Sequence, residues 1–256
     1  MNWNEEPKTE RFGSPMLPAI KQFIVFLIGW IGFKIVATSI QVAFILVARA
    51  NGWNASEFLS QNSTSMIINS LCYIGLLVAL VLVANTNILK LLKSFKQWQS
   101  YGAGVVALMA IFAFNITYNI FIEALKQAGI INIPISDNAN QTAIVSLESQ
   151  YPFTCLFVFG LIGPICEELT YRVGLFSLLK RRNRVMAYFV SIVVFAFIHF
   201  NVSTNPTTLM NEIINLPSYM FAGFAFAFAY DKFGFAGSLT AHALNNIIGI
   251  VPAIFR

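Results

Sequence analysis

The chain has 256 residues, of which 57% are hydrophobic and only 11% are charged. Soluble globular domains carry about 25% charged residues, so this composition excludes the soluble class and indicates a membrane protein. The net charge of +5 does not indicate a nucleic-acid partner, because Lys and Arg beside membrane segments more often record topology.

Seven apolar segments are predicted to cross the membrane, each close to the roughly 20 residues that a hydrocarbon core about 30 Å thick requires. In chain order they lie near 20–48, 65–85, 102–124, 152–179, 186–203, 209–230 and 235–254. The first is too long for a signal-peptide core and is predicted to be retained as an anchor. The predicted fold class is therefore all-α, a polytopic membrane helical bundle of about seven transmembrane helices.

Basic residues predict the orientation of this bundle. Lys and Arg concentrate in two connectors, near 90–96 and 180–184, whereas the loops around 51–64 and 201–208 contain neither. Short basic loops favour the cytoplasmic side, so we expect a cytoplasmic N-terminus and an external C-terminus. Residues 1–19 are then a cytoplasmic segment, and residues 20–256 form one bundle. The longest external loop, 126–150, has room for a short interfacial helix.

The fourth predicted span contains three ionisable groups, in the sequence CEELTYR. Each costs about 2.5 to 3.5 kcal/mol near the centre of a membrane helix, so such groups pair or line a cavity. Glu168 and Arg172 are four residues apart and are predicted to form an ion pair. Glu167 points about 100° away from Glu168 and needs a partner from another helix. Pro164, shortly before it, removes a helix hydrogen bond, which predicts either a bend that opens a wet pocket or a kink used only for packing.

Helical rise places the candidate partners of Glu167 at a similar depth. Glu167 and His199 each lie 13 residues from the predicted cytoplasmic end of their helix, or roughly 20 Å into the membrane. His242 and Asn246 lie at roughly 10 and 16 Å in the seventh span. His242 and Asn246 share one helix face, as do Phe195 and His199, since each pair is four residues apart. Lys34 in the first span is either a counter-charge to this group or a side chain that reaches the interface.

Three motifs carry a family resemblance. EELTYR fits EExxxR, FAFIH fits FxxxH and HALNN fits HxxxN, in the order typical of the CPBP intramembrane protease family, also called the CAAX prenyl protease 2 or Abi family. The resemblance covers about residues 150–250. It implies an endopeptidase in which Glu167 activates water with help from His199. It also implies that His242 and Asn246 stabilise the oxyanion, while Glu168 and Arg172 support the site. Phe195 opens the second motif and is expected to support the site by packing.

The chemistry of these residues agrees with that reading. Hydrolysis of an amide without a covalent nucleophile needs a base for water and donors for the oxyanion. A zinc ion held by Glu167, His199 and His242 is the alternative, but the chain has no HExxH motif, so we favour a mechanism with no required metal or other cofactor. Ser238 lies on the same helix face as His242, which disfavours a serine nucleophile.

Two other functions stay open at this stage. A proton-coupled transporter could use the same buried polar residues, and a non-catalytic protein could act in bacteriocin self-immunity or as a sensor scaffold. As a protease, the chain is expected to act on a membrane-associated peptide or protein. We expect a multi-pass protein of a bacterial plasma membrane whose partners are that substrate and the lipid bilayer.

Overall fold

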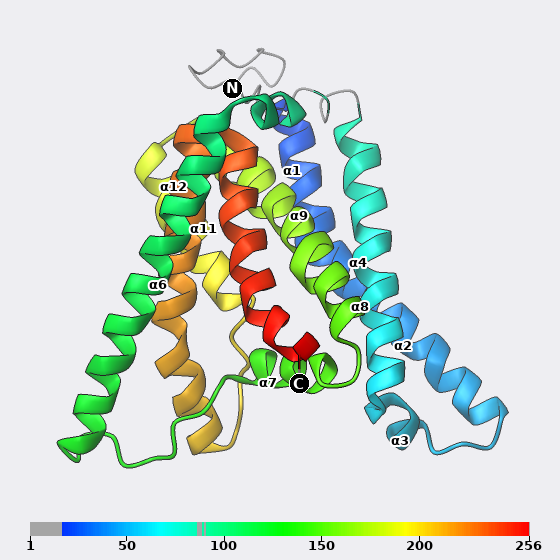
Figure 1. Ribbon diagram of the computed structural model, residues 1–256. Coiled ribbons are helices and arrows are strands. Elements are labelled where there is room, and N and C mark those ends of the chain that lie inside the picture. The colour runs from blue at the N-terminus through cyan, green and yellow to red at the C-terminus, as the bar shows by residue number, and fades with distance from the viewer. Residues whose placement is uncertain (1–16, 86–88, 90, 256) are drawn as a thin grey trace.

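The computed structural model describes residues 17–85, 89 and 91–255, and every regular element in that part of the chain is helical. Long rods run side by side between two ends of the molecule, and the start of α1 and the C-terminal turn lie at opposite ends (Figure 1). Most of the predicted cytoplasmic segment 1–19 falls outside the described residues. The division of the chain into that segment and one bundle stays a prediction.

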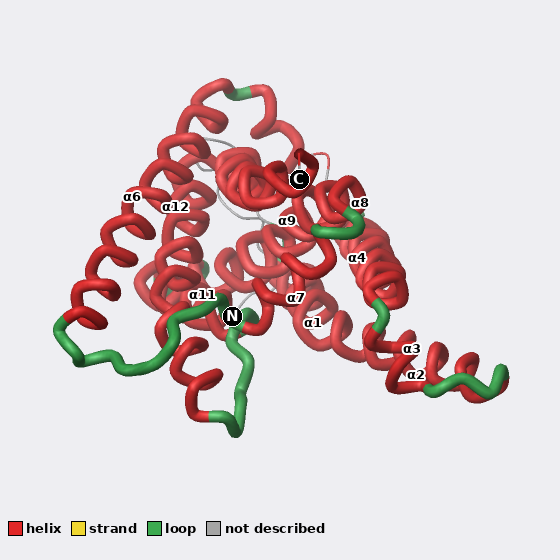
Figure 2. The backbone as a smooth tube through the Cα atoms, turned by 60° about the horizontal axis from the view of Figure 1, so that its bottom comes forward, coloured by secondary structure: helices red, strands yellow, loops and turns green. Residues whose placement is uncertain are grey.

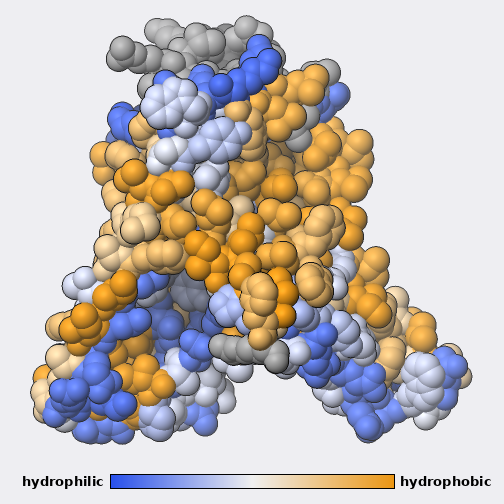
Figure 3. All heavy atoms as spheres, viewed as in Figure 1, coloured by the Kyte–Doolittle hydropathy of each residue, from blue (hydrophilic) through white to orange (hydrophobic). Residues whose placement is uncertain are grey.

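Five helical stretches are long and apolar enough to cross a membrane: Ala19–Ala50, Asn62–Ala84, Trp98–Gln127, Pro152–Lys180 and Pro206–Phe255. Their apolar side chains form a broad band over the surface, with polar side chains at both ends (Figure 3). The predicted fold class, an all-helical polytopic membrane bundle, is confirmed. The count of seven spans and the cytoplasmic side of the N-terminus are not confirmed.

Two features separate the observed count from the predicted one. The fifth predicted span corresponds to α11 (Arg184–Phe197), whose 14 residues reach only about 21 Å, less than the roughly 30 Å of a hydrocarbon core. The sixth and seventh predicted spans are the two arms of α12 (Pro206–Ile250), which is interrupted at Gly234 with φ 75°. Glycine adopts positive φ without steric cost, and here it reverses the chain so that the arms run in opposite directions (Figure 1).

The first rod comprises α1 (Ala19–Leu27), the π-helical η1 (Ile28–Gly32) and α2 (Phe33–Ala50). This rod packs tightly against the fourth span: a Cβ at Gly29 of η1 would lie 1.9 Å from Thr170 Oγ1. α2 and the short α3 (Ala55–Ser60) project away from the other helices (Figure 2). Lys34 is exposed on α2, so it lies on the outer surface rather than beside the buried acids.

The fourth span is the central helix of the bundle, with 61% of its apolar window buried against 11 to 28% for the other four. It comprises five segments: α8 (Pro152–Phe157), η3 (Val158–Ile162), α9 (Gly163–Glu167), η4 (Glu168–Phe176) and α10 (Ser177–Lys180), with η3 and η4 π-helical. Pro164 is the second residue of α9, one residue beyond the wide turn of η3. Widened turns of this kind recur at functional sites, and η3 and η4 lie on either side of the short α9 that ends at Glu167.

The remaining helices enclose the central one. They are α4 (Asn62–Ala84), η2 (Leu92–Lys96), α6 (Trp98–Gln127), α7 (Ala139–Glu148) and η5 (Val251–Phe255). α6 packs on α12 so closely that a Cβ at Gly104 would lie 2.6 Å from Thr240 Cβ. The predicted short helix in the long loop is α7, which lies near the C-terminal end of the bundle (Figure 1). All three cysteines are buried and free.

Candidate active site

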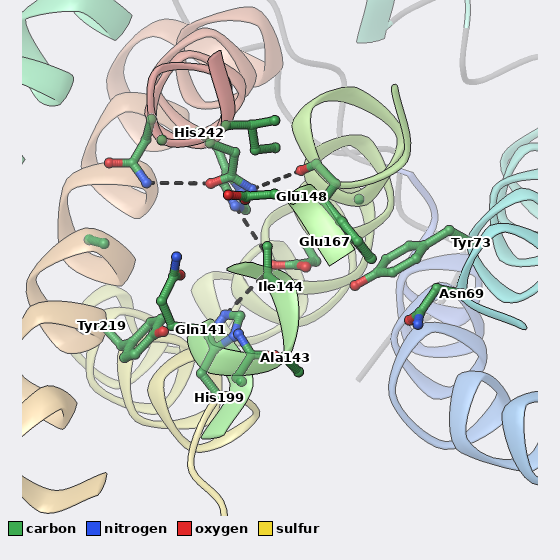
Figure 4. Close-up of a pocket in the computed structure, with 18 of the residues that line it drawn as sticks. Asn69, Tyr73, Gln141, Ala143, Ile144, Glu148, Glu167, His199, Tyr219 and His242 are labelled. Atoms are coloured by element: carbon green, nitrogen blue, oxygen red, sulfur yellow. Dashed lines mark hydrogen bonds and ion pairs between the residues drawn. The ribbon is translucent and has the colours of Figure 1, made fainter. Parts of the chain in front are cut away.

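A cavity of about 340 Å³ lies between the central helix, α4, α7 and both arms of α12. Glu167, His199 and His242 come from three separate regions of the chain and line it (Figure 4), and Asn246 of α12 lines it as well. The structure therefore brings together the four side chains that the sequence predicted as catalytic. α7 contributes one wall, through residues that include Gln141, Ile144 and Glu148.

Glu167 is the last residue of α9 and points into the cavity, between the two histidines. Its Oε2 atom lies 3.9 Å from His199 Nε2 and 3.7 Å from His242 Nε2. Both distances exceed the 3.2 Å limit typical of N–H···O hydrogen bonds, and no other described residue bonds to this oxygen. The carboxylate is thus held close to two imidazoles at the cavity wall, and its Oε2 atom is buried without a hydrogen-bond partner among the described residues.

Glu168 has a different environment, as its rotation about the helix predicts. Its side chain is fully buried, and its Oε2 atom lies 3.4 Å from Arg172 Nε, which is the predicted ion pair. The same carboxylate accepts hydrogen bonds from Ser238 Oγ and from His242 Nδ1, the latter at 2.8 Å. Glu168 therefore fixes His242 across the helix interface in addition to pairing with Arg172. Ser238 donates to this buried carboxylate, which leaves it badly placed as a nucleophile.

This contact defines what His242 offers to the cavity. A carboxylate only accepts hydrogen bonds, so a neutral His242 carries its proton on Nδ1 and presents an unprotonated Nε2 towards Glu167. In that form Nε2 accepts a proton. The predicted role of His242 as an oxyanion donor requires the doubly protonated ring.

Arg172 and Phe195 pack against each other and support the two imidazole rings. The guanidinium carbon lies 4.4 Å from the centre of the Phe195 ring, and Arg172 Nη2 donates to Gly223 O at 3.4 Å. The Phe195 ring meets His199 and His242 edge-on, at centroid distances of 5.2 and 5.7 Å. Phe195 therefore separates the histidines and sets the distance between them.

The position of His199 depends on residues that sequence reasoning missed. His199 follows the end of α11, and its carbonyl accepts a hydrogen bond from Asn138 Nδ2 at 3.1 Å. Its ring stacks on Tyr219 at 4.6 Å, and the Tyr219 hydroxyl donates to Asn138 Oδ1. Asn138 also caps the N-terminus of α7 by accepting from Gln141 N. Asn138 therefore connects α7 to the segment that contains His199.

Glu212 makes a second connection between α7 and the segment that follows α11. This buried carboxylate of α12 accepts hydrogen bonds from Ala139 N at 2.8 Å and from Asn201 N at 3.0 Å. An acidic residue inside a predicted span indicates that it has a buried partner, and Glu212 is such a residue. Its partners are backbone groups, which a residue pattern does not reveal.

Asn246 lies in the cavity but is already engaged. Its Nδ2 atom donates to Phe159 O at 3.0 Å, and its Oδ1 atom accepts from Asn245 Nδ2 at 3.4 Å. One hydrogen of Nδ2 remains for the predicted oxyanion role. Tyr73 of α4 also lines the cavity, with its hydroxyl directed towards Glu167 (Figure 4).

The donors do not fit a preformed zinc site. Ligand atoms about 2.0 to 2.1 Å from a tetrahedral zinc ion lie roughly 3.3 Å apart, which is closer than the 3.7 and 3.9 Å between Glu167 and the two histidines. No group of three or more His, Cys, Asp or Glu side chains in the described ranges has the geometry to hold a metal ion. We therefore derive no step through a metal, and the zinc alternative stays a hypothesis.

Comparison with known proteins agrees with the motifs. The family model described as type II CAAX prenyl endopeptidase Rce1-like matches residues 149–248. The UPF0177 protein YvdC of Lactococcus lactis subsp. lactis (strain IL1403) is 23% identical over 151 residues, which cover 59% of this chain and 52% of that protein. The chain thus spans about half the length of this curated relative. No solved structure matches. The family resemblance predicted from three motifs is confirmed for residues 149–248, and the chain is a multi-pass membrane protein.

Proposed function

We propose that this protein is an intramembrane endopeptidase that hydrolyses a peptide bond of a membrane-associated protein or peptide with a water activated by Glu167. One observation carries the proposal: a carboxylate that lines a cavity faces the Nε2 atoms of two histidines and has no short hydrogen bond from either of them. The match to a family described as endopeptidases supports the same reaction class.

In the proposed reaction, a water bound between Glu167 and His199 attacks the carbonyl carbon of the substrate. Glu167 accepts one proton of that water as the new C–O bond forms. Asn246, and His242 in its doubly protonated form, donate hydrogen bonds to the developing oxyanion. The C–N bond then breaks while the proton held by Glu167 passes to the amide nitrogen. The products are a carboxylic acid and an amine, which exchange a proton to give a carboxylate and an ammonium group.

The lining of the cavity suits a peptide. Five carboxamide side chains face it, from Asn69, Asn140, Gln141, Asn245 and Asn246. A carboxamide both donates and accepts hydrogen bonds, so it matches the N–H and C=O groups of an extended backbone. The family match does not favour the alternatives of a proton-coupled transporter or of a non-catalytic immunity or scaffold protein. We propose that the protein lies in a bacterial plasma membrane, because its curated relative comes from a bacterium.

The test compares wild type with Glu167→Ala, both purified in detergent, on a fluorophore–quencher peptide library with and without a chelator. We expect the wild type to cleave, the variant to be inactive and the chelator to have no effect. Loss of wild-type cleavage with the chelator, restored by zinc, would support the metal alternative. Equal cleavage by both preparations would exclude the role of Glu167.

A further inference from the structure

His199 differs from the other three candidate catalytic residues in the backbone that carries it. Glu167 ends α9, and His242 and Asn246 lie inside α12, so helical hydrogen bonds fix their positions. His199 lies beyond the end of α11, in the irregular segment 198–205. Side chains on helices are held more precisely than side chains on loops. The position of His199 therefore depends on what holds this segment.

Two buried side chains hold segment 198–205, and each of them also bonds to the start of α7. Asn138, which is 3% exposed, donates from Nδ2 to His199 O at 3.1 Å and accepts from the first turn of α7 at 2.9 Å. Glu212, which is 1% exposed, accepts from Asn201 N with one carboxylate oxygen and from Ala139 N with the other. Hydrogen bonds to a carboxylate are stronger than those to a neutral acceptor.

Tyr219 of α12 extends these contacts to the imidazole itself. Its ring stacks on His199 at 4.6 Å, and its hydroxyl donates to Asn138 Oδ1 at 3.3 Å (Figure 4). Asn138 thus bonds both to the backbone of His199 and to the residue on which the His199 ring packs. The ring needs such support, because a displacement of about 1 Å at a reacting group costs on the order of 10²-fold in rate.

We propose that Asn138 and Glu212 are positioning residues, which hold segment 198–205 against α7 and so keep the His199 imidazole beside Glu167. The inference rests on the proposed function for the role of His199, and it adds the residues that set its geometry. Asn138 and Glu212 do not line the cavity, so both act through His199. Since α7 does line the cavity, the same contacts couple this wall to His199.

The test uses two variants that break these contacts in different ways. Asn138→Ser keeps a residue type that caps a helix N-terminus, but its side chain is too short to reach His199 O. Glu212→Gln keeps the shape of the side chain and turns one of its two acceptors into a donor, which then faces a backbone N–H.

Asn211→Ser is the matched control. Asn211 precedes Glu212 on α12 and is 5% exposed. Its side chain bonds to Ser136 N and Pro134 O, in the chain before α7, and not to segment 198–205. This variant therefore removes a buried amide at the same place without touching the support of His199.

The readout that a merely structural role would not move is the NMR spectrum of the histidine rings. The chain has two histidines, so isotope-labelled histidine reports only His199 and His242, and a His199→Gln protein assigns the signals. In Asn138→Ser and Glu212→Gln we expect the His199 signals to shift or broaden while those of His242 stay as in wild type. In the cleavage assay kcat should fall by about 10- to 100-fold, with KM within about twofold of wild type. The control should change neither the spectrum nor kcat.

The positioning role is overturned by His199 signals that both variants leave unchanged, or by equal changes at His199 and His242, which indicate a general loss of structure. A wild-type kcat despite displaced His199 signals overturns it as well. If Glu212→Gln does not fold, Asn138→Ser decides alone. Selective displacement of the His199 signals, in a protein whose wild type cleaves no peptide, would sink the protease and leave the positioning of His199 standing.

Discussion

Two carboxylates inside this protein have different surroundings: Glu167 lines the cavity, and Asp231 lies near the basic end of the bundle. Asp231 Oδ1 lies 2.7 Å from Lys180 Nζ, while Oδ2 accepts from Arg184 and, at 2.9 Å, from the Tyr188 hydroxyl. Glu167 Oε2 has only the two imidazoles, at 3.7 and 3.9 Å. Both side chains are largely shielded from solvent, so low exposure alone does not mark a reacting group.

What differs is how fully each carboxylate is engaged. Fixed cations hold Asp231 and join α12 to the turn between α10 and α11, which is a structural role. Glu167 is held near groups that exchange protons and opens onto a cavity, which is the arrangement that general-base chemistry needs. The comparison predicts that removal of Glu167 costs activity and removal of Asp231 costs stability.

The largest expected effect is that of Glu167→Gln on catalysis. Loss of the base should lower kcat by about 10²- to 10⁴-fold. Thermal stability in detergent should stay close to wild type, because this carboxylate has no short contact to lose. Cleavage assays and a thermal unfolding curve on the same preparation measure both quantities. A variant that unfolds early while its kcat is retained would reverse the roles assigned to the two acids.

Glu168→Gln should reduce both stability and activity, since it removes the counter-charge of Arg172 and the acceptor of His242 Nδ1. An uncompensated buried charge costs about 3 to 5 kcal/mol. Adding Arg172→Met to Glu168→Gln should restore much of the stability, because no charge is then left unpaired. Activity should stay low in the double variant, as His242 still lacks its acceptor. Recovery of activity together with stability would show that Glu168 serves only as a counter-ion.

Asp231→Asn should destabilise the fold by about 1 to 3 kcal/mol, the usual cost of a buried hydrogen-bonding group that loses its charged partner. The effect is smaller than for Glu168, because Arg184 is half exposed and water can solvate it when the pair is broken. The folded fraction should retain the wild-type KM and kcat. A fall in kcat without loss of stability would place Asp231 in the reaction instead.

The rise per residue of an α-helix was sufficient to predict that Glu167 and His199 lie at the same depth. A membrane aligns its spans, so residue counts from one end translate into height, and spacings of four residues give the shared faces. The same rules predicted the ion pair of Glu168 with Arg172, which lies within one helix. These predictions depend only on local geometry and on the plane of the bilayer.

Contacts between helices could not be predicted in the same way. The bond from Ser238 to Glu168 and the stacking of His199 on Tyr219 depend on how each helix is rotated against its neighbour. The count of seven spans is not confirmed for a related reason: α11 ends at Phe197, and the irregular segment 198–205 follows it. Because part of this segment is apolar, its sequence resembles the end of a helix.

The smallest expected effect is that of Tyr73→Phe, which tests one neighbour of Glu167. It belongs to α4, outside the segment that the family model matches, and its backbone carbonyl contacts Cys166 Sγ at 3.6 Å, one residue before Glu167. Its hydroxyl is directed towards Glu167 (Figure 4), so Tyr73→Phe removes a polar neighbour of that carboxylate and keeps the ring packed on Phe159. If that hydroxyl bonds to Glu167 during the reaction, its loss costs about 0.5 to 1.5 kcal/mol, or up to roughly a tenfold change in kcat. KM should not change if Tyr73 acts on Glu167, whereas a role in holding the substrate would raise KM and leave kcat unchanged. Tyr101→Phe is the control, because Tyr101 donates to a backbone carbonyl, Phe95 O, away from the cavity.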